Sequence, residues 1–150
     1  MDERALLACI GWVALGFEVV QSLFPGWRFR APDTVAAFGL HAALFLGEPI
    51  AVTPDTEAAW LEALGRFEVQ LRRGGAVVET GRASNVLSGG PLAALRHLVE
   101  VLAEDPCGPA LAEGEVVTTC TLTNAYPIRT GETWDTRVAS LPLADIRLAF

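Results

Sequence analysis

The sequence predicts an α+β domain that is rich in short β-strands and has two main helices. Three observations support this class. Apolar residues fall at helical spacing in two segments, one opening at Asp55 or Thr56 and the other at Pro91. Short apolar or alternating runs, separated by Gly and Pro turns, occupy most of the remaining chain. The 150 residues, of which 51% are hydrophobic, suffice for one folded domain with its own core.

The first half of the chain is expected to alternate short helices with strands. A short helix is predicted over 3–10, followed by a strand over 13–21 and a turn at Pro25-Gly26. Asp33 is expected to cap a helical piece over 34–39, and a further strand is predicted from His41 to Leu46. In the first main helix the apolar positions are Trp60, Leu61, Leu64 and Phe67.

The second half is expected to contain a hairpin, the strongest helix and a series of strands. Residues 67–80 are predicted to form the hairpin, and 81–90 a loop. The helix opens at Pro91 and ends at Asp105-Pro106. Strands are predicted over 115–121, 125–128, 133–138 and 145–150, the second of them at an edge because it contains Pro127.

Charge and composition exclude several classes of function. The formal charge is -7, and the basic residues are 11 Arg with no Lys. Nucleic-acid binding is not expected, because it depends on clustered basic side chains. Lysine chemistry, including Schiff bases and P-loops, cannot come from this chain. No apolar run reaches the roughly 18–20 residues that span a bilayer, and 5–17 lacks the cleavage site of a signal peptide. Cys9, Cys107 and Cys120 form no paired motif, so we expect reduced thiols and a cytoplasmic protein.

Glu18 is the most informative candidate for function. It lies in the apolar run Val13-Ala14-Leu15-Gly16-Phe17-Glu18-Val19-Val20, which predicts a buried strand. A buried carboxylate is costly unless it is paired, hydrogen-bonded or bound to a metal. A metal-ligand role is therefore one hypothesis. The alternatives are a side chain that points out of the sheet and one that pairs with an arginine.

Other polar residues give weaker signals. Thr118, Thr119 and Thr121 close a predicted strand and offer hydroxyl donors for a carboxylate or carbonyl oxygen, although Thr is also a common strand residue. His41 and His97 are not at metal-ligand spacing, and structural or surface roles are expected for both. The Gly-rich loop over 81–90 lacks the order of a phosphate-binding motif.

Three blocks of the sequence match one known family in order and spacing. The first is Ala14-Leu15-Gly16-Phe17-Glu18-Val19-Val20-Gln21-Ser22, with Trp27 following. The second runs from Asn85-Val86-Leu87 to Gly90-Pro91-Leu92-Ala93-Ala94-Leu95, and the third is Gly114-Glu115-Val116-Val117-Thr118-Thr119-Cys120-Thr121. Over essentially its whole length the chain resembles the fumarylacetoacetate hydrolase superfamily, in its branch of 2-keto-4-pentenoate hydratases and 4-oxalocrotonate decarboxylases.

The resemblance implies a β-rich mixed-sheet roll of that superfamily's C-terminal type, with a site for Mg²⁺ or Mn²⁺ that binds a 2-oxo acid. Glu18 matches the family's third metal carboxylate, and Thr119 matches a hydroxyl position that contacts substrate. Arg28 is a candidate for binding the substrate carboxylate, and the catalytic residues stay unassigned. Family members are commonly oligomeric. The strand over 13–21 opens the chain with almost nothing upstream to cover its edges, so a homo-oligomer is expected.

The chain also departs from the family pattern. The other two metal carboxylates form a Glu-x-Glu pair upstream of Glu18 in the family, and the catalytic lysine lies upstream as well; neither has a match here. Cys120 replaces a usual Gly, and Gln21 stands where Asp is common. One carboxylate cannot hold a hard cation tightly. Residues 1–150 are therefore expected to form a single catalytic domain that lacks its N-terminal part.

The implied activity is that of a lyase. It would hydrate 2-hydroxy-2,4-dienoates, or decarboxylate related 2-oxo acids, through a metal-stabilised enolate in aromatic-compound catabolism. An acylpyruvate C–C hydrolase uses the same chemistry and is the alternative enzyme. A truncated relative without turnover is the non-catalytic alternative, and a small acidic binding module is the generic one.

Overall fold

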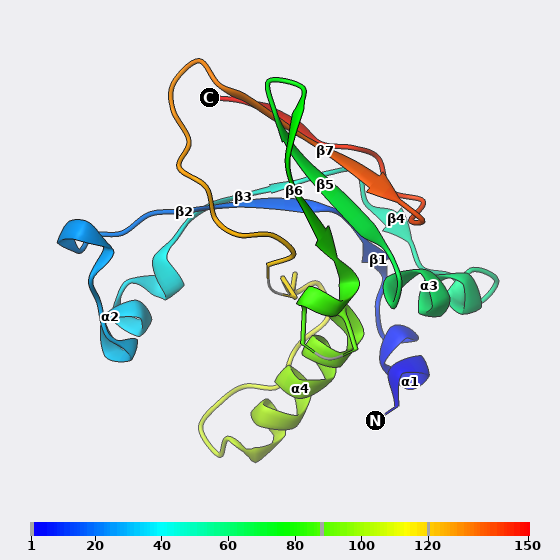
Figure 1. Cartoon of the computed structure of the whole chain (residues 1–150). Coiled ribbons are helices and arrows are strands. Elements are labelled where there is room, and N and C mark those ends of the chain that lie inside the picture. The colour runs from blue at the N-terminus through cyan, green and yellow to red at the C-terminus, as the bar shows by residue number, and fades with distance from the viewer. Residues whose placement is uncertain (1, 88, 120) are drawn as a thin grey trace.

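A computed structural model describes residues 2–87, 89–119 and 121–150 of the chain. The fold is α+β, as the sequence predicts (Figure 1). Its elements follow in the order α1 (Glu3–Leu7), β1 (Trp12–Val13), β2 (Gly16–Val20), η1 (Pro25–Trp27), α2 (Ala31–Ala36), η2 (Phe38–Leu40), β3 (His41–Leu46), β4 (Ile50–Ala51), α3 (Glu57–Leu64), β5 (Glu68–Arg73), β6 (Ala76–Arg82), η3 (Ala83–Asn85), α4 (Pro91–Glu104), β7 (Thr133–Ala139) and β8 (Arg147–Ala149).

The largest sheet is antiparallel, with the strand order β6-β5-β7-β8. Its central strand β5 alternates in burial, because Val69 and Leu71 face the core while Gln70 faces solvent. Leu71 lies opposite Thr136, which is buried and whose hydroxyl accepts the Ile146 N–H at 2.9 Å. The predicted hairpin and the strands over 133–138 and 145–150 are thereby confirmed, the last as the shorter β8.

Three helices pack together beside this sheet and form the second part of the core. Leu7 of α1, Trp60 and Leu64 of α3, and Leu92 of α4 make one buried cluster. Pro91 occupies the first turn of α4, where its missing N–H costs nothing, so the helix begins where the sequence predicts. The prediction of α3 is confirmed as well, with Thr56 as its N-cap.

The predicted strand over 13–21 is split in two, and it is not buried. β1 pairs with β4, whereas β2 pairs with β3 as a separate two-stranded ribbon. Leu15, between β1 and β2, is buried in a cluster with Phe67, Val69, Ala83 and Ile146, but no residue of β2 itself is buried. The apolar run suggested a core strand; in the ribbon, by contrast, every residue of β2 and β3 is exposed or only partly buried.

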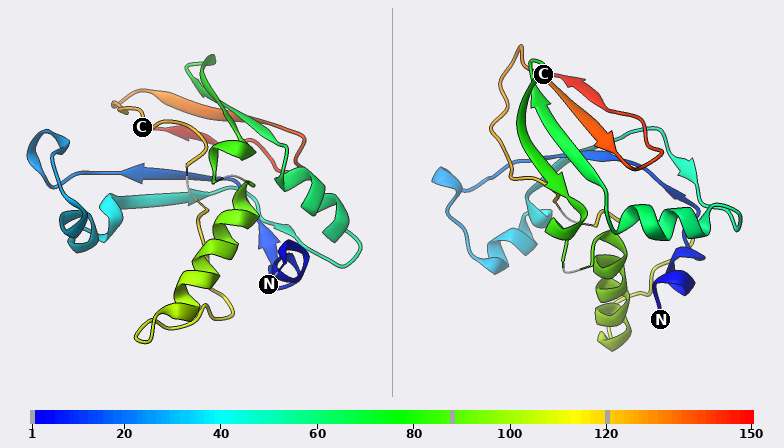
Figure 2. Two further views of the ribbon diagram at one scale, coloured as in Figure 1. Left: turned by 60° about the horizontal axis from the view of Figure 1, so that its bottom comes forward. Right: turned by 45° about the vertical axis from the view of Figure 1, so that its right-hand side comes forward.

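The ribbon carries a projecting arm at its far end, formed by residues 21–40 (Figures 1 and 2). Within it α2 begins at Ala31, earlier than the predicted helical piece over 34–39. Asp33 lies inside the helix rather than at its cap, and its carboxylate accepts the Arg30 N–H at 2.8 Å. Pro32 explains the difference, because proline is favoured in the first turn of a helix.

Two predicted strands, over 115–121 and 125–128, are absent from the part of the chain that the structure describes. The described residues of 106–132 form neither helix nor strand. We call residues 116–128 the strap. The loop predicted over 81–90 begins later than expected, because β6 continues to Arg82 and a 3-10 turn follows.

The chain exposes more surface than a compact monomer of its mass. Its accessible surface is 9850 Å² for 16.0 kDa, whereas folded monomers of this size expose about 7,400 Å². The arm contributes to this excess, since Leu23, Val35 and Phe38 are 74%, 79% and 87% exposed. Among the described residues, no helix is long and apolar enough to cross a membrane.

Candidate functional site

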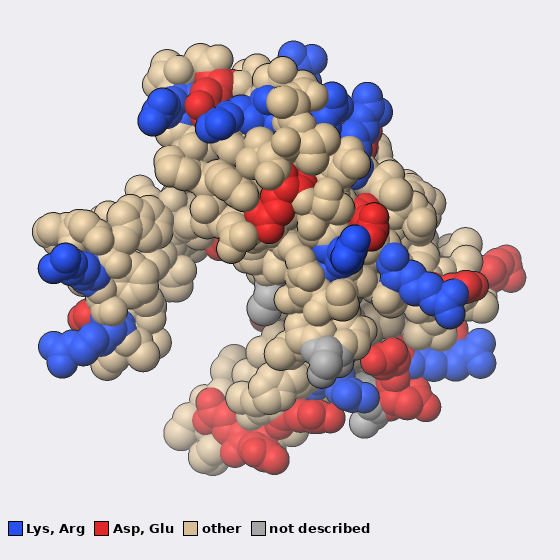
Figure 3. Space-filling model, in the orientation of Figure 1, with Lys and Arg blue, Asp and Glu red and all other residues tan. Residues whose placement is uncertain are grey.

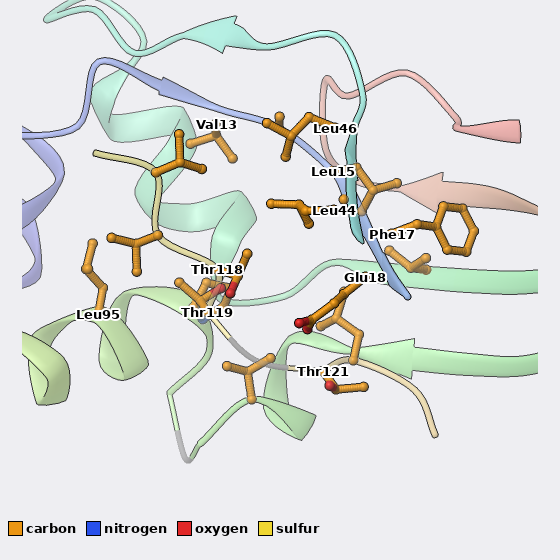
Figure 4. A pocket seen from close by; sticks show the side chains of 18 of the residues that line it. Val13, Leu15, Phe17, Glu18, Leu44, Leu46, Leu95, Thr118, Thr119 and Thr121 are labelled. Atoms are coloured by element: carbon orange, nitrogen blue, oxygen red, sulfur yellow. The ribbon is translucent and has the colours of Figure 1, made fainter. Parts of the chain in front are cut away.

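A large hollow lies between the ribbon, α4 and the strap, and it opens beside the arm (Figure 3). Its volume is about 1600 Å³, which exceeds the roughly 300–1,000 Å³ of ordinary small-molecule clefts. Most of its wall is apolar, with Leu44 and Leu46 from β3 and Leu95 from α4 among its lining residues (Figure 4). The hollow is therefore wide enough for a ligand together with a further segment of polypeptide.

Glu18 points from β2 into this hollow (Figure 4). It lies opposite Leu44 in the ribbon, so both side chains stand on the same face. The side chain is 40% exposed, so the strand does not bury this carboxylate, and the alternative of a side chain that points out of the sheet fits better. A hydrogen bond of 2.9 Å joins Glu18 Oε1 to Nδ1 of His41, the ring nitrogen donating. The partner is thus a histidine, where the sequence suggested a metal or an arginine.

Thr118, Thr119 and Thr121 of the strap lie on the same hollow as Glu18 (Figure 4). Thr119 is half-buried, and Thr118 and Thr121 are exposed. Their hydroxyl groups can donate to a carboxylate or carbonyl oxygen, as the sequence suggested, although they lie on irregular backbone rather than on a strand. Cys120, which stands where the family usually has Gly, lies outside the described residues.

Arg28 is not brought to this hollow by the described residues. It follows η1 on the arm and is exposed, whereas its neighbour Trp27 contributes to the hollow's wall. His97 is exposed on α4, as expected. Of the three residues proposed from the sequence as ligands of metal or substrate, the structure brings Glu18 and Thr119 to one hollow and leaves Arg28 outside it.

A carboxylate on the hairpin, Glu79 of β6, holds the strap in place. Its Oε2 accepts the Tyr126 hydroxyl at 2.8 Å and the Asn124 N–H at 3.0 Å, and its Oε1 accepts the Asn124 amide Nδ2 at 3.1 Å. These three donors lower the pKa of Glu79, the Tyr126 hydroxyl having the largest effect. The same bond raises the pKa of Tyr126.

Sequence reasoning missed this cluster because Asn124 and Tyr126 lie 45 and 47 residues after Glu79 in the chain. No local spacing connects a strand residue with an irregular segment so far along the chain. The sequence placed Gly81 in the predicted loop over 81–90, whereas the structure has it in β6, where a glycine indicates a close backbone approach. The structure shows that approach: a Cβ at Gly81 would lie 2.5 Å from the Leu122 carbonyl oxygen.

The described residues do not complete a metal site. Glu18, Glu113 and Glu115 are the acidic residues on the hollow's wall. Glu115 accepts the Ala112 N–H at 2.8 Å, which occupies one of its carboxylate oxygens. In the described ranges no three His, Cys, Asp or Glu side chains come together as a metal would require. One carboxylate with threonine hydroxyls is fewer oxygen ligands than Mg²⁺ needs, so these residues alone do not fit the ion.

Comparison with known proteins places the fold. No family model matches the chain. A structure of 4-oxalocrotonate decarboxylase from Pseudomonas putida G7, complexed with magnesium and adipate, matches 99% of this chain with a TM-score of 0.79 and 25% identity. The chain has the fold of that decarboxylase over its matched part. A second structure of this enzyme, complexed with calcium and acetate, matches 99% of the chain with a TM-score of 0.76 and 24% identity.

The chain spans about half the length of these structures, 52% in each case. The match supports the fold of the fumarylacetoacetate hydrolase superfamily that the sequence resemblance implied, and it confirms the predicted fold class. The neighbours bind a divalent cation, and one of them also holds a dicarboxylate.

Proposed function

We propose that this chain supplies part of the site of a divalent-metal-dependent lyase that acts on 2-oxo acids. The observation that carries the proposal is the match of 99% of the chain to a decarboxylase complexed with magnesium and adipate. Within the chain, Glu18 and Thr119 line one hollow, which supports a shared role for a carboxylate ligand and a hydroxyl donor. These two residues are also the ones that the family resemblance singles out.

In this proposal each part of the hollow has a defined task. Glu18 is one ligand of Mg²⁺ or Mn²⁺, and further oxygen ligands come from another polypeptide segment. Thr119 donates its hydroxyl to a carboxylate or carbonyl oxygen of the substrate. The apolar wall formed by Leu44, Leu46 and Leu95 excludes water around the hydrocarbon part of the substrate.

Two lyase reactions fit the proposal, hydration of 2-hydroxy-2,4-dienoates and decarboxylation of related 2-oxo acids in aromatic-compound catabolism. The two structures that the chain matches are of a decarboxylase, which supports the second reaction more directly. A relative without turnover is supported by one observation, the incomplete ligand set among the described residues. An acylpyruvate hydrolase has no specific support in the structure.

We also propose that the chain works as an assembly with a second copy. Support comes from the surface, which exceeds that of compact monomers of this mass by about a third. Stable obligate interfaces bury about 2,000–5,000 Å² in total, counted over both partners. The excess surface of one chain, about 2,400 Å², is enough for an interface of this size. The hollow and the exposed arm are the surfaces that such an interface would cover.

Calorimetric titration with Mn²⁺ and then adipate tests the metal role. We expect the parent chain in its associated form, where a second copy brings further oxygen ligands, to bind Mn²⁺. Glu18→Gln should weaken that binding by more than about tenfold, because removing a ligand exceeds the effect of removing a supporting group. The matched control is Glu48→Gln, which removes the same charge from an exposed residue outside the hollow's wall. Equal Mn²⁺ affinity in the parent chain and Glu18→Gln, or no binding at all, contradicts the proposal and favours the relative without turnover.

A further inference from the structure

The strap forms one wall of the hollow without any secondary structure of its own. Its described residues, 116–119 and 121–128, belong to neither helix nor strand. Thr119 and Thr121 therefore cannot be held by a ladder of backbone hydrogen bonds within a sheet. Their positions must depend on contacts that the strap makes with its neighbours.

Three such contacts follow Thr121 along the chain, and they involve strand β6 and the 3-10 turn η3 after it. The Leu122 carbonyl accepts the Asn85 amide at 2.8 Å. Its oxygen also lies so close to strand β6 that only the missing side chain of Gly81 leaves room for it. Asn124 and Tyr126 then bind the single carboxylate of Glu79.

Glu79 is suited to this task because an ionised carboxylate accepts several hydrogen bonds at once. Bonds to a charged group are stronger than bonds between neutral groups. The Tyr126 ring also lies 6.0 Å from the ring of Trp134, which is buried in β7. The strap is thus attached on one side to β6 and on the other to β7, two strands that flank β5 in the sheet.

We propose that Glu79 is a positioning residue that fixes Thr119 and Thr121 on the wall of the hollow that Glu18 faces. The inference rests on the proposed function, because that function makes the threonines the groups that bind substrate. Glu79 acts through Asn124 and Tyr126 and does not itself touch substrate. Neither the spacing of the sequence nor the family resemblance points to this residue.

Nuclear magnetic resonance of the ¹⁵N-labelled full chain tests the placement directly. In Glu79→Gln we expect the amide exchange rate of Asn124 to rise by roughly tenfold or more, because this N–H loses a charged acceptor. The resonances of Thr118, Thr119 and Thr121 should shift with it. The matched control is Glu68→Gln, which removes an exposed carboxylate from the adjacent strand β5, where it binds Arg82 at 2.7 Å and not the strap. Unchanged threonine resonances and unchanged Asn124 exchange in Glu79→Gln overturn the inference.

A second measurement separates positioning from a general loss of structure. We expect adipate affinity in the presence of Mn²⁺ to fall roughly tenfold in Glu79→Gln, while Mn²⁺ affinity at Glu18 stays at the parent value. Tyr126→Phe should show part of the same effect, and the double variant should be no weaker than Glu79→Gln because both changes act on one bond. Additive losses, or an equal loss of Mn²⁺ affinity, contradict the inference.

The outcomes distinguish this inference from the proposed function. A parent chain that binds neither Mn²⁺ nor adipate refutes the proposed function, whereas the resonance experiment still decides whether Glu79 places the threonines. Should Glu79→Gln fail to fold, Tyr126→Phe decides, since it removes one hydroxyl and leaves the carboxylate with Asn124. Threonine resonances that do not move in Tyr126→Phe then count against the inference.

Discussion

Replacing Gly81 by alanine tests the contact between the strap and β6 at its closest point. The alanine Cβ would lie 2.5 Å from the Leu122 carbonyl oxygen and 2.9 Å from the Leu122 carbonyl carbon and Cβ. Two of these three atoms are backbone, so no rotation of a flexible side chain relieves the overlap. Contact between carbon atoms is favourable only from about 3.5 Å, so the strap must move by roughly 1 Å.

The cost of that movement can be bounded. Overpacking of this kind costs about 1–3 kcal/mol. An alanine restricts the unfolded chain, which opposes the loss by about 0.4–1 kcal/mol. We therefore expect Gly81→Ala to lower the free energy of unfolding by about 1–2 kcal/mol. The displaced segment carries Thr121 directly before Leu122, so adipate affinity should fall as well.

Urea unfolding followed by circular dichroism measures the stability change. The control is Gly11→Ala, because an added Cβ there meets no atom within 4 Å. We expect the control to keep or slightly raise the unfolding midpoint. If Gly81→Ala is as stable as Gly11→Ala, and the amide exchange of Asn124 is the same in both, then the strap does not lie against β6 as described.

Three further predictions follow from the fold. Leu7→Ala should lower the free energy of unfolding by about 2–5 kcal/mol, because Leu7 is 0% exposed in the cluster formed by the three helices. Val35→Ala on the exposed arm should change the free energy of unfolding by less than about 0.5 kcal/mol, and the urea midpoints of the two variants test this difference. The pKa of Glu79 is lowered, so its contribution to stability is present above its ordinary value of 4.5 and is lost as pH falls through the lowered value. The stability gap between the parent chain and Glu79→Gln should therefore be constant from pH 4.5 to neutral pH and should close below pH 4.5, as urea melts at a series of pH values would show. In analytical ultracentrifugation the parent chain should sediment as an associated species. Phe38→Asp, which places a charge on an exposed side chain of the arm, should shift the chain toward the monomer without changing its circular dichroism. A parent chain that sediments as a monomer at about 100 μM would refute the assembly proposal.

Local signals in the sequence were sufficient for the elements whose packing is local. Pro91 and the apolar stripe after it determine where α4 begins, and the Gly74-Gly75 turn determines the β5–β6 hairpin. The strand over 13–21 failed because an apolar run does not say how many layers cover it. Leu15 is buried and Val19 is only partly so, although both lie in one continuous hydrophobic stretch.

The strap shows the opposite failure. Val116, Val117 and the threonines after them have the residue types of a strand, yet the described residues there pair with no neighbour. Side-chain acceptors at Glu79 and side-chain donors at Asn85 take the place of a ladder, and such partners are fixed only once the whole fold has formed. Glu18 and Thr119 could be named from the sequence, but the residue that places the strap beside them could not.

Under the proposed function, the position of Glu18 would connect cation binding with assembly. Glu18 stands on a two-stranded ribbon whose strand β2 buries no residue, and such ribbons are only marginally stable in water. A surface that covers the hollow would order this ribbon and exclude water from the carboxylate, which strengthens its attraction for a cation. Such a coupling is reciprocal. If Glu18 and ligands on the covering surface share one cation, assembly raises the affinity for the cation and the cation raises the affinity of assembly by the same factor. The described residues alone do not complete the ligand set, and one covering surface that brings oxygen ligands would meet this requirement.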